Sequence, residues 1–252
     1  MRESMEQLHP KITPIQQLDL DSINAMYRLY ADYYACTNLV AFQKDLSQKN
    51  TVLQIFNDEK QLIGFTTILN YAISYQGQTL QIIYSGDTIM AEQYWGTPIL
   101  AFSWLKFAGG LKAQYPEQSL YWFIIVKGHR TYRYLPVFSK VFYPNYQYPT
   151  PQWEQHLIDH LAHATFGKHY QKTLGTVHFP TSQGHLKQHW AQIPEKLLQR
   201  KDIQFFKQKN PNYHLGDELV CLCKLDENNL KPLAQRLFQE GYLKHYDEHV
   251  VV

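Results

Sequence analysis

The sequence predicts a mixed α/β fold, in which a sheet with parallel and antiparallel strands is flanked by helices and followed by a mostly helical elaboration. Three observations lead to this prediction. A helical period of apolar residues opens the chain, three extended runs joined by short turns follow, and a continuously apolar run comes after the next helix. Short turns join antiparallel neighbours, and a strand that is apolar throughout is typical of one covered on both faces.

The first elements are a short strand and two helices. Residues 12–18 are expected to form the strand, and Asp19 or Asp21 supplies the oxygen that caps the helix after it. The apolar positions of that helix recur at steps of three and four, which place them on one face: Ile23, Met26, Tyr27, Tyr30 and Tyr34. Thr37 or Asn38 then begins a second, short helix.

Three extended runs rich in β-branched and aromatic residues follow, at 51–56, 62–75 and 79–90. The turns between them are short, so the three strands are expected to form an antiparallel meander. Gly86 lies inside the third run, where a glycine marks a bulge or a close approach of another group to the backbone.

The next helix begins near Thr97 or Pro98. It is expected to weaken at Gly109-Gly110, because glycine is a poor helix former. The apolar run at 119–126 is the strand expected to be buried on both faces.

A basic, aromatic segment at 127–142 follows this strand and is expected to be a helix interrupted at Pro136. Beyond it, residues 149–151 (Pro-Thr-Pro) mark a boundary or a rigid turn. The last hundred residues are expected to hold helices at 152–166 and 184–208, the second broken near Pro194, a strand at 217–224 and a closing amphipathic helix at 228–240.

Composition and charge narrow the class of function. Of the 252 residues, 44% are hydrophobic and 18% are charged, which excludes a disordered chain. A net charge of +2 is too small for the basic stripe of a nucleic-acid-binding domain. Residues 1–11 lack the apolar core of a signal peptide, and no apolar stretch reaches the roughly 20 residues of a spanning helix, so no membrane partner is expected. Three cysteines without framework spacing fit the reducing cytoplasm.

His156, His160 and His163 are spaced by four and three residues on an expected helix. Imidazoles one turn apart can share a zinc ion, but the glutamate of the H-E-x-x-H pattern is missing between them. A chain with 12 histidines also forms such spacings by chance. We therefore predict no metal and interpret these histidines as a polar helix face.

Three segments carry a resemblance to a known family. Residues 62–65 (Leu-Ile-Gly-Phe), 92–99 (Glu-Gln-Tyr-Trp-Gly-Thr-Pro-Ile) and 138–144 (Phe-Ser-Lys-Val-Phe-Tyr-Pro) resemble, in this order, three sequence patterns of the GNAT superfamily of N-acetyltransferases. The order of the expected elements over residues 12–145 is also similar to that of this family. The resemblance implies a GNAT-like, acyl-coenzyme A-binding domain over residues 1–148. Residues 149–252 are then an extension that packs on it.

In that family, backbone amides after the fourth strand hold the coenzyme A pyrophosphate at a helix start, where N–H groups are unpaired. The resemblance assigns coenzyme binding here to Trp95, Gly96, Thr97, Ile99 and Leu100. The sequence departs from the family pattern at Trp95, which replaces an arginine, and at Pro98, which replaces a glycine and lacks an N–H. The resemblance also places Gly86 where two strands part around the pantetheine arm.

A cluster of basic residues follows the buried strand, at Lys127, His129, Arg130 and Arg133. It lies beside the expected coenzyme cleft. Arg130 and Arg133 are therefore candidate contacts to the coenzyme phosphates, because guanidinium groups bind phosphate strongly. The alternative is a basic helix face in solvent, which is the usual role of a charge run.

Amine acetylation in this family usually involves direct attack of the amine on the thioester, with a base for the amine proton and an acid for the leaving thiolate. The resemblance places the acid at Phe138, which has no proton to give, so Tyr132 and Tyr134 are the candidates. Asp87 is the candidate base, with Glu92 as a second. Asp87 could equally bond within the bulge, as aspartate does in turns, and each tyrosine could be part of the core.

These observations predict an acyl-coenzyme A-dependent N-acyltransferase that uses acetyl-coenzyme A or another acyl-coenzyme A. Its acceptor is an amine of a small molecule or a protein, which the sequence does not identify, and the oligomeric state also stays open. One alternative is a GNAT-like module that binds a ligand without catalysis, favoured by Trp95, Pro98 and Phe138. The other is a scaffold whose exposed aromatic side chains bind a partner protein.

Overall fold

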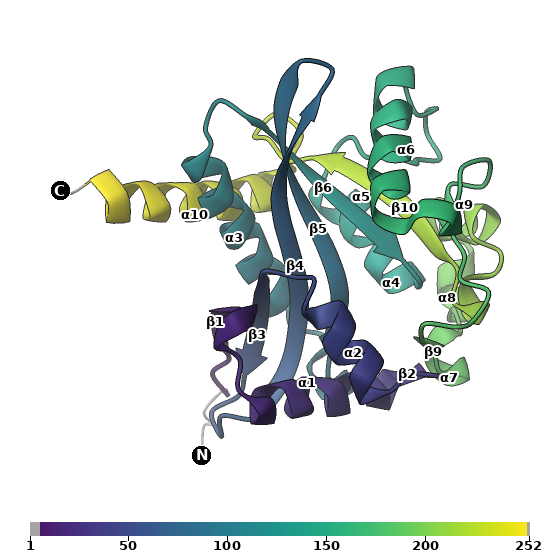
Figure 1. Cartoon of the computed structure of the whole chain (residues 1–252), viewed down its shortest axis with the longest axis horizontal. Coiled ribbons are helices and arrows are strands. Elements are labelled where there is room, and N and C mark those ends of the chain that lie inside the picture. The colour runs from purple at the N-terminus through teal and green to yellow at the C-terminus, as the bar shows by residue number, and fades with distance from the viewer. Residues whose placement is uncertain (1–5, 251–252) are drawn as a thin grey trace.

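The computed structural model describes residues 6–250, whose main feature is an eight-stranded mixed sheet with helices on both faces (Figure 1). Across the sheet the strands are β1 (His9–Pro14), β3 (Thr51–Phe56), β4 (Leu62–Tyr75), β5 (Gln78–Met90), β6 (Ser119–Val126), β10 (Glu218–Lys224), β8 (Thr176–Val177) and β7 (Tyr170–Gln171). A separate two-stranded sheet pairs β2 (Tyr34–Ala35) with β9 (His185–Leu186). The mixed α/β fold predicted from the sequence is confirmed.

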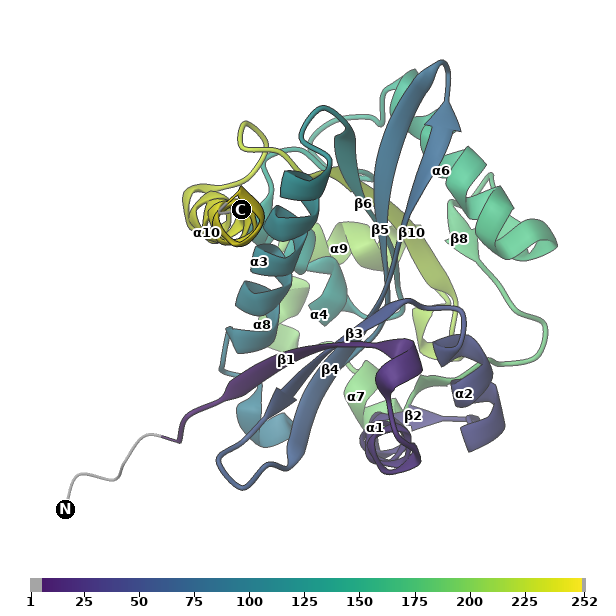
Figure 2. The ribbon, with the colours of Figure 1, turned by 60° about the vertical axis from the view of Figure 1, so that its left-hand side comes forward.

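Helices cover both faces of the large sheet. The longer ones are α1 (Leu20–Tyr33), α2 (Leu39–Leu46), α3 (Ile99–Gln114), α6 (Gln152–Phe166), α9 (Lys201–Lys209) and α10 (Pro232–Val250). Short helices and 3-10 turns complete the chain: α4 (His129–Tyr132), α5 (Tyr134–Phe138), α7 (Gln188–Ala191), α8 (Glu195–Leu198), η1 (Ile15–Gln17), η2 (Glu92–Tyr94), η3 (Gly167–His169) and η4 (Tyr213–Leu215). Figure 2 shows α3 and α10 on one side of the sheet and α6 on the other.

The strands β1, β3, β4 and β5 are antiparallel neighbours, as the short turns predict. β5 and β6 are parallel, and α3 carries the chain between them, because parallel neighbours need a crossover connection. Both faces of the central strands are buried. Ile83 and Trp122 face the core beneath α3 and α10, whereas Ile82 and Phe123 face the core beneath α6.

The predicted bulge lies at Gly86. Thr66 is paired with Thr88 and Ile68 with Ser85, so Gly86 and Asp87 together oppose the single residue Thr67. Beyond Ser85, β5 no longer pairs with β6. The two parallel strands therefore part at the bulge. Beyond it, the β5 backbone is not paired with β6.

Gly109 and Gly110 do not weaken α3, which continues to Gln114, and this expectation from the sequence was wrong. A methyl group on Gly109 would collide with the carbonyl oxygen of Phe238 on α10, and one on Gly241 would collide with α3 in the same way. The two helices thus approach each other through glycine. The packing gained at this contact offsets the low helix propensity of glycine.

Several expected boundaries are corrected. The first strand is His9–Pro14, and the chain tightens into η1 at Ile15. The segment at 127–142 is not one helix broken at Pro136 but two short ones that meet at Arg133. Pro136 lies in the first turn of α5, where a missing N–H costs nothing.

The expected helix at 184–208 is instead β9, α7, α8 and α9 in succession, because Pro194 and the polar residues around it interrupt the helical pattern. The closing helix begins at Pro232 and runs to Val250, later and longer than expected. The helix at 152–166 and the strand near 217–224 form as predicted.

Residues from the last hundred enter the large sheet. β10 pairs antiparallel with β6 over Leu219–Lys224, and β8 and β7 extend the sheet beyond it. α10 packs along α3 on the opposite side from α6. The division of the chain at residue 148 stays a prediction.

Candidate active site

A groove of about 890 Å³ opens where β5 and β6 part. Its walls come from the start of α3, from α4 and α5 after β6, and from the segment 186–197. Six of the residues assigned from the sequence line this groove: Trp95, Thr97, Leu100, Arg130, Arg133 and Tyr134. The basic segment is therefore a wall of the groove rather than a helix face that points only to solvent.

The start of α3 holds unpaired backbone donors beside the groove. Leu100 lines the groove, whereas Gly96 and Ile99 lie outside its lining. The amides of Gly96, Ile99 and Leu100 have no acceptor among the described residues, and the N-cap residue Pro98 provides no side-chain cap. The amides of Trp95 and Thr97 donate instead to carbonyl oxygens within the turn. Three of the five assigned amides thus remain available. Unpaired N–H groups and the helix dipole make such a start a binding site for an anion.

Trp95 forms a wall of the groove and leaves it open. Its indole Nε1 donates to the carbonyl oxygen of Met90 at 2.7 Å, and its ring packs edge-on against Trp190. The guanidinium of Arg130 lies 4.4 Å from the Trp95 ring centre and donates to the carbonyl oxygen of Trp190 at 3.0 Å. Arg133 brings a second guanidinium, whose buried Nε has no partner among the described residues.

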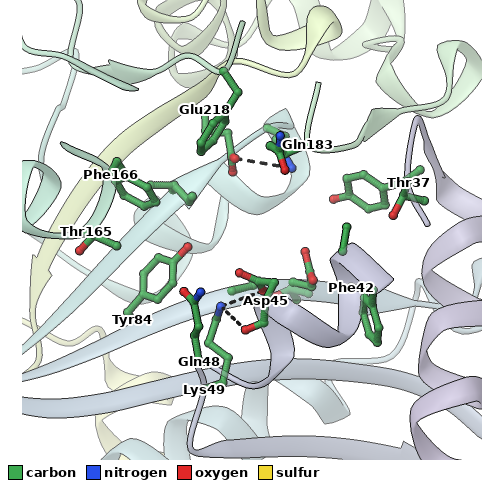
Figure 3. A pocket seen from close by; sticks show the side chains of 18 of the residues that line it. Thr37, Phe42, Asp45, Gln48, Lys49, Tyr84, Thr165, Phe166, Gln183 and Glu218 are labelled. Atoms are coloured by element: carbon green, nitrogen blue, oxygen red, sulfur yellow. Dashed lines mark hydrogen bonds and ion pairs between the residues drawn. The ribbon is translucent and has the colours of Figure 1, made fainter. Parts of the chain in front are cut away.

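A second cavity, of about 380 Å³, lies on the other side of the bulge, and we call it the acceptor pocket. Its charged side chains come from separate parts of the chain: Lys44, Asp45 and Lys49 from α2 and the turn after it, Asp87 from the bulge, Lys127 directly after β6 and Glu218 from β10. Its apolar walls are mainly aromatic: Tyr30, Tyr34, Phe42, Tyr84, Phe166 and Phe179. In Figure 3, Asp45 and Lys49 lie across the opening from Glu218 and Gln183.

Four of the six charged side chains that line the acceptor pocket are paired with one another. Lys49, whose side chain is only 3% exposed, donates to Asp45 at 2.8 Å. The ammonium of Lys127 lies 3.5 Å from the Glu218 carboxylate. Asp87 has no ion pair within reach among the described residues. It is the carboxylate left over in the pocket.

The environment of Asp87 disfavours its charge. Burial raises the pKa of its carboxyl, and the charge of Asp45 raises it further, while Lys127 and Lys49 oppose both effects, so that the pKa lies at about 7. Burial also raises the pKa of Glu218. A carboxyl group with a pKa near neutrality can accept and release a proton under ordinary conditions, which is what a general base requires.

The groove and the acceptor pocket meet at the bulge. Tyr34, Thr88 and Thr131 line both cavities. A molecule that enters along the groove and one held in the pocket would therefore face each other beside Asp87. This geometry suits the transfer of a group from one molecule to the other.

The structure separates the other catalytic candidates. Tyr134 lines the groove and stacks on Phe138 with ring centres 5.7 Å apart. Tyr132 is fully buried, lines neither cavity and donates its hydroxyl to the carbonyl oxygen of Pro144 at 3.1 Å. Glu92 is exposed and also lies outside both cavities. Asp87 and Tyr134 are thus the two candidates at the site.

Sequence reasoning did not single out Asp45, Lys49 or Glu218. Asp45 and Lys49 are an acid and a base four residues apart, which on the sequence resembles an ordinary pair on a helix surface. Glu218 becomes part of the site only because β10 pairs with β6. The one signal for it was an acidic residue at the start of a predicted strand.

The histidines of α6 are His156, His160 and His163. Among the side chains that the structure describes, those of residues 6–245, no three of His, Cys, Asp or Glu are grouped so that they could hold a metal ion. His160 and His163 pack against Tyr75 and Tyr170. No helix in this part of the chain is long and apolar enough to cross a membrane.

No protein-family model and no curated protein matches the sequence. Solved structures with a similar arrangement include a probable N-acyltransferase of unknown function from Enterococcus faecalis (15% identity, TM-score 0.39). The match covers 54% of this chain and 33% of the Enterococcus protein. They also include the GNAT family N-acetyltransferase YhbS from Escherichia coli in complex with CoA (14% identity, TM-score 0.36, 52% of this chain and 69% of that one). A third is NAA60 from Arabidopsis thaliana with a bisubstrate analogue (16% identity, TM-score 0.35, 53% and 86%). The chain thus spans about one third of the length of the first of these proteins.

Proposed function

We propose that the chain is an acyl-coenzyme A-dependent N-acyltransferase that transfers an acyl group, most simply acetyl, to an amine. The observation that carries the proposal is the meeting of two cavities at the β5 bulge. One has an anion-binding helix start and two guanidinium groups, and the other has a single unpaired carboxylate. The thioester would supply the acyl carbon that the amine attacks.

The groove fits an anionic coenzyme in its chemistry. The amides of Gly96, Ile99 and Leu100 can donate to a pyrophosphate, as a helix start commonly does. Arg130 and Arg133 can pair with phosphate oxygens, and the unpaired Nε of Arg133 lacks any other acceptor among the described residues. These residues would hold the coenzyme along the groove with its thioester toward the bulge.

Asp87 and Tyr134 would move the protons. As the C–N bond forms and the C–S bond breaks, Asp87 takes the proton that the amine loses. Tyr134 gives a proton to the sulfur that leaves. Burial raises the pKa of the Tyr134 hydroxyl, so it stays protonated at neutral pH and can act as the acid.

The cytoplasmic location expected from the sequence belongs to this proposal. It is supported by the three free thiols Cys36, Cys221 and Cys223, two of which are buried. A ligand-binding module without catalysis is the alternative. It is favoured by Phe138, which lines the groove where the resemblance puts an acid.

Two measurements separate these functions. Coenzyme A at one hundred times its dissociation constant should stabilise the fold by about 2.7 kcal/mol, seen as a raised melting temperature. Release of the coenzyme thiol from acetyl-coenzyme A in the presence of a mixture of primary amines then reports transfer. Asp87→Asn should lower the rate by about 10²–10⁴-fold, whereas Asp32→Asn, on the exposed side of α1, serves as the matched control. Coenzyme binding without any thiol release would leave only the binding module.

A further inference from the structure

Lys49 is a buried lysine in the wall of the acceptor pocket, in the turn after α2. Its side chain is 3% exposed, whereas that of its partner Asp45 is 50% exposed. Lysine is rarely buried to this degree unless its ammonium group is paired. Here Nζ donates to the carboxylate of Asp45 at 2.8 Å and to the carbonyl oxygen of the same residue at 3.3 Å (Figure 3). One residue thus holds the ammonium group twice.

The alkyl chain of Lys49 lies across the bulge that carries Asp87. A methyl group on Gly86 would stand 2.8 Å from Cε of Lys49 and 3.6 Å from its Nζ, and it would also collide with the hydroxyl of Thr67. The φ of Gly86 is not positive, so the close approach of these side chains is what requires glycine here. Lys49 therefore packs directly on the residue before Asp87.

The ring of Tyr84 gives Lys49 a further contact on β5. The ammonium nitrogen lies 5.4 Å from the centre of this ring, within the range in which an aromatic face attracts a cation. Tyr84 and Gly86 both belong to β5. Lys49 therefore joins the turn after α2 to the strand that carries Asp87.

The charged and titratable groups around Asp87 come from every element that lines the pocket. They are Tyr30 (α1), Tyr34 (β2), Lys44 and Asp45 (α2), Lys49, Tyr84 (β5), Lys127 (after β6), His169 (η3) and Glu218 (β10). Burial raises the pKa of all three tyrosines, so their hydroxyls stay uncharged at neutral pH. Lys127 and Glu218 pair with each other, which leaves Lys49 and Asp45 as the second ion pair beside Asp87.

From this packing we propose, on the basis of the transferase function above, that Lys49 is a positioning residue for Asp87. Its alkyl chain holds the bulge in place. Its ammonium group forms, with Asp45, an ion pair whose two charges act on the Asp87 carboxyl in opposite directions.

The opposition of the two charges distinguishes this role from simple packing. Burial is the main cause of the raised pKa of Asp87. Within the pair, Asp45 raises this pKa further and Lys49 opposes it, because an anion disfavours a carboxylate and a cation favours it. Removal of one member should therefore move the protonation of Asp87 one way, and removal of the other should move it the opposite way. Loss of packing alone gives no such pattern.

Lys49→Met and Asp45→Asn are the variants that test the proposal. Methionine is an unbranched side chain that can fill the space on Gly86 without a charge, and it leaves Asp45 where water reaches it. Asparagine keeps a side-chain oxygen that can accept a hydrogen bond from Lys49. Both variants are therefore expected to fold, which circular dichroism checks.

The protonation of Asp87 is followed by carbon-13 NMR of the aspartate carboxyl groups, without coenzyme or amine, and Asp87→Asn assigns the signal. Lys49→Met should raise the midpoint of the titration by about one pH unit, and Asp45→Asn should lower it by a similar amount. The double variant should titrate between the two single variants. Lys106→Met is the matched control, because it removes one member of an exposed ion pair on α3, and it should leave the midpoint unchanged. Midpoints that do not move, or that move the same way in both single variants, would overturn the proposal.

The pH profile of kcat, measured by thiol release from acetyl-coenzyme A, supplies the matching readout of activity. Its rising limb should move to higher pH in Lys49→Met and to lower pH in Asp45→Asn, because it reports the protonation of the base. Thiol release with unmoved NMR midpoints would end the proposal for Lys49 while the transferase stands. If the wild-type chain releases no thiol with any amine, the transferase fails. The NMR midpoints then still decide whether Lys49 and Asp45 act on Asp87.

Discussion

Replacing Asp87 with asparagine should stabilise the fold at alkaline pH while it removes the proposed base. Burial, and then the charge of Asp45, raises the pKa of this carboxyl from 3.8 to about 7 in the folded chain. The folded state therefore holds the proton more tightly than the unfolded chain does. The stability that this proton contributes is complete below the unfolded pKa and is lost as the pH rises through the folded pKa. Asparagine keeps the shape of the protonated acid and cannot ionise.

The size of the effect follows from the shift. Each pKa unit corresponds to about 1.4 kcal/mol, so the full difference would be roughly 4 kcal/mol above pH 7. Asp87 is only half-buried, and screening by water reduces this to about 2 kcal/mol. For a chain of 252 residues this raises the melting temperature by about 4–8 °C.

Thermal unfolding followed by circular dichroism at pH 5.5 and pH 8.5 measures this difference. Asp87→Asn should gain most at pH 8.5 and about half as much at pH 5.5, where the carboxyl of the folded wild-type chain is protonated and only its ionisation in the unfolded chain still favours unfolding. Asp32→Asn, an exposed residue on α1, should gain nothing at either pH. If Asp87→Asn melts at or below the wild-type temperature at pH 8.5, the ionised carboxylate does not destabilise the fold. A raised pKa of Asp87, and with it the argument for a general base, would then be refuted.

Three further predictions concern other parts of the molecule. Arg130→Ala combined with Arg133→Ala should weaken coenzyme A binding about tenfold or more by calorimetry. Unchanged affinity would mean that neither guanidinium group contacts the coenzyme phosphates. Tyr134→Phe should lower kcat about 10²-fold with coenzyme affinity intact, and an unchanged kcat would mean that the thiolate obtains its proton elsewhere. Gly109→Ala should destabilise the fold by about 2 kcal/mol or more in denaturant titration, because the methyl group would strike the main chain of α10. Its neighbour Gly110, with the nearest atom at 3.6 Å, should accept alanine without loss.

The local part of the fold could be predicted because each signal lies within a few residues. The meander follows from short turns, and the bulge follows from one glycine inside a strand, at Gly86. The start of α3 follows from Pro98 and the apolar period after it. These signals predict where the groove lies. The parting of β5 from β6 is a local consequence of the bulge at Gly86, and the unpaired amides are a local consequence of the helix start at Pro98.

The acceptor pocket could not be predicted, because its residues meet only through long-range pairing. Glu218 reaches Lys127 because β10 aligns Leu219 with Val126 across almost a hundred residues of sequence. No local pattern fixes that register, since every residue of β10 except Lys224 is buried and the strand has no polar face to orient it. The pairing of β2 with β9 involves two residues on each side and carries no sequence signal of its own.

The last hundred residues therefore take part in the site and do more than cover the sheet. Without β10 the ammonium of Lys127 would lack its carboxylate and would stand as an uncompensated charge beside Asp87. A free ammonium there would lower the pKa of Asp87 and repel a cationic amine, so the pairing with Glu218 keeps the carboxyl basic and the pocket receptive. The same extension thus contributes to the proton affinity of the proposed base.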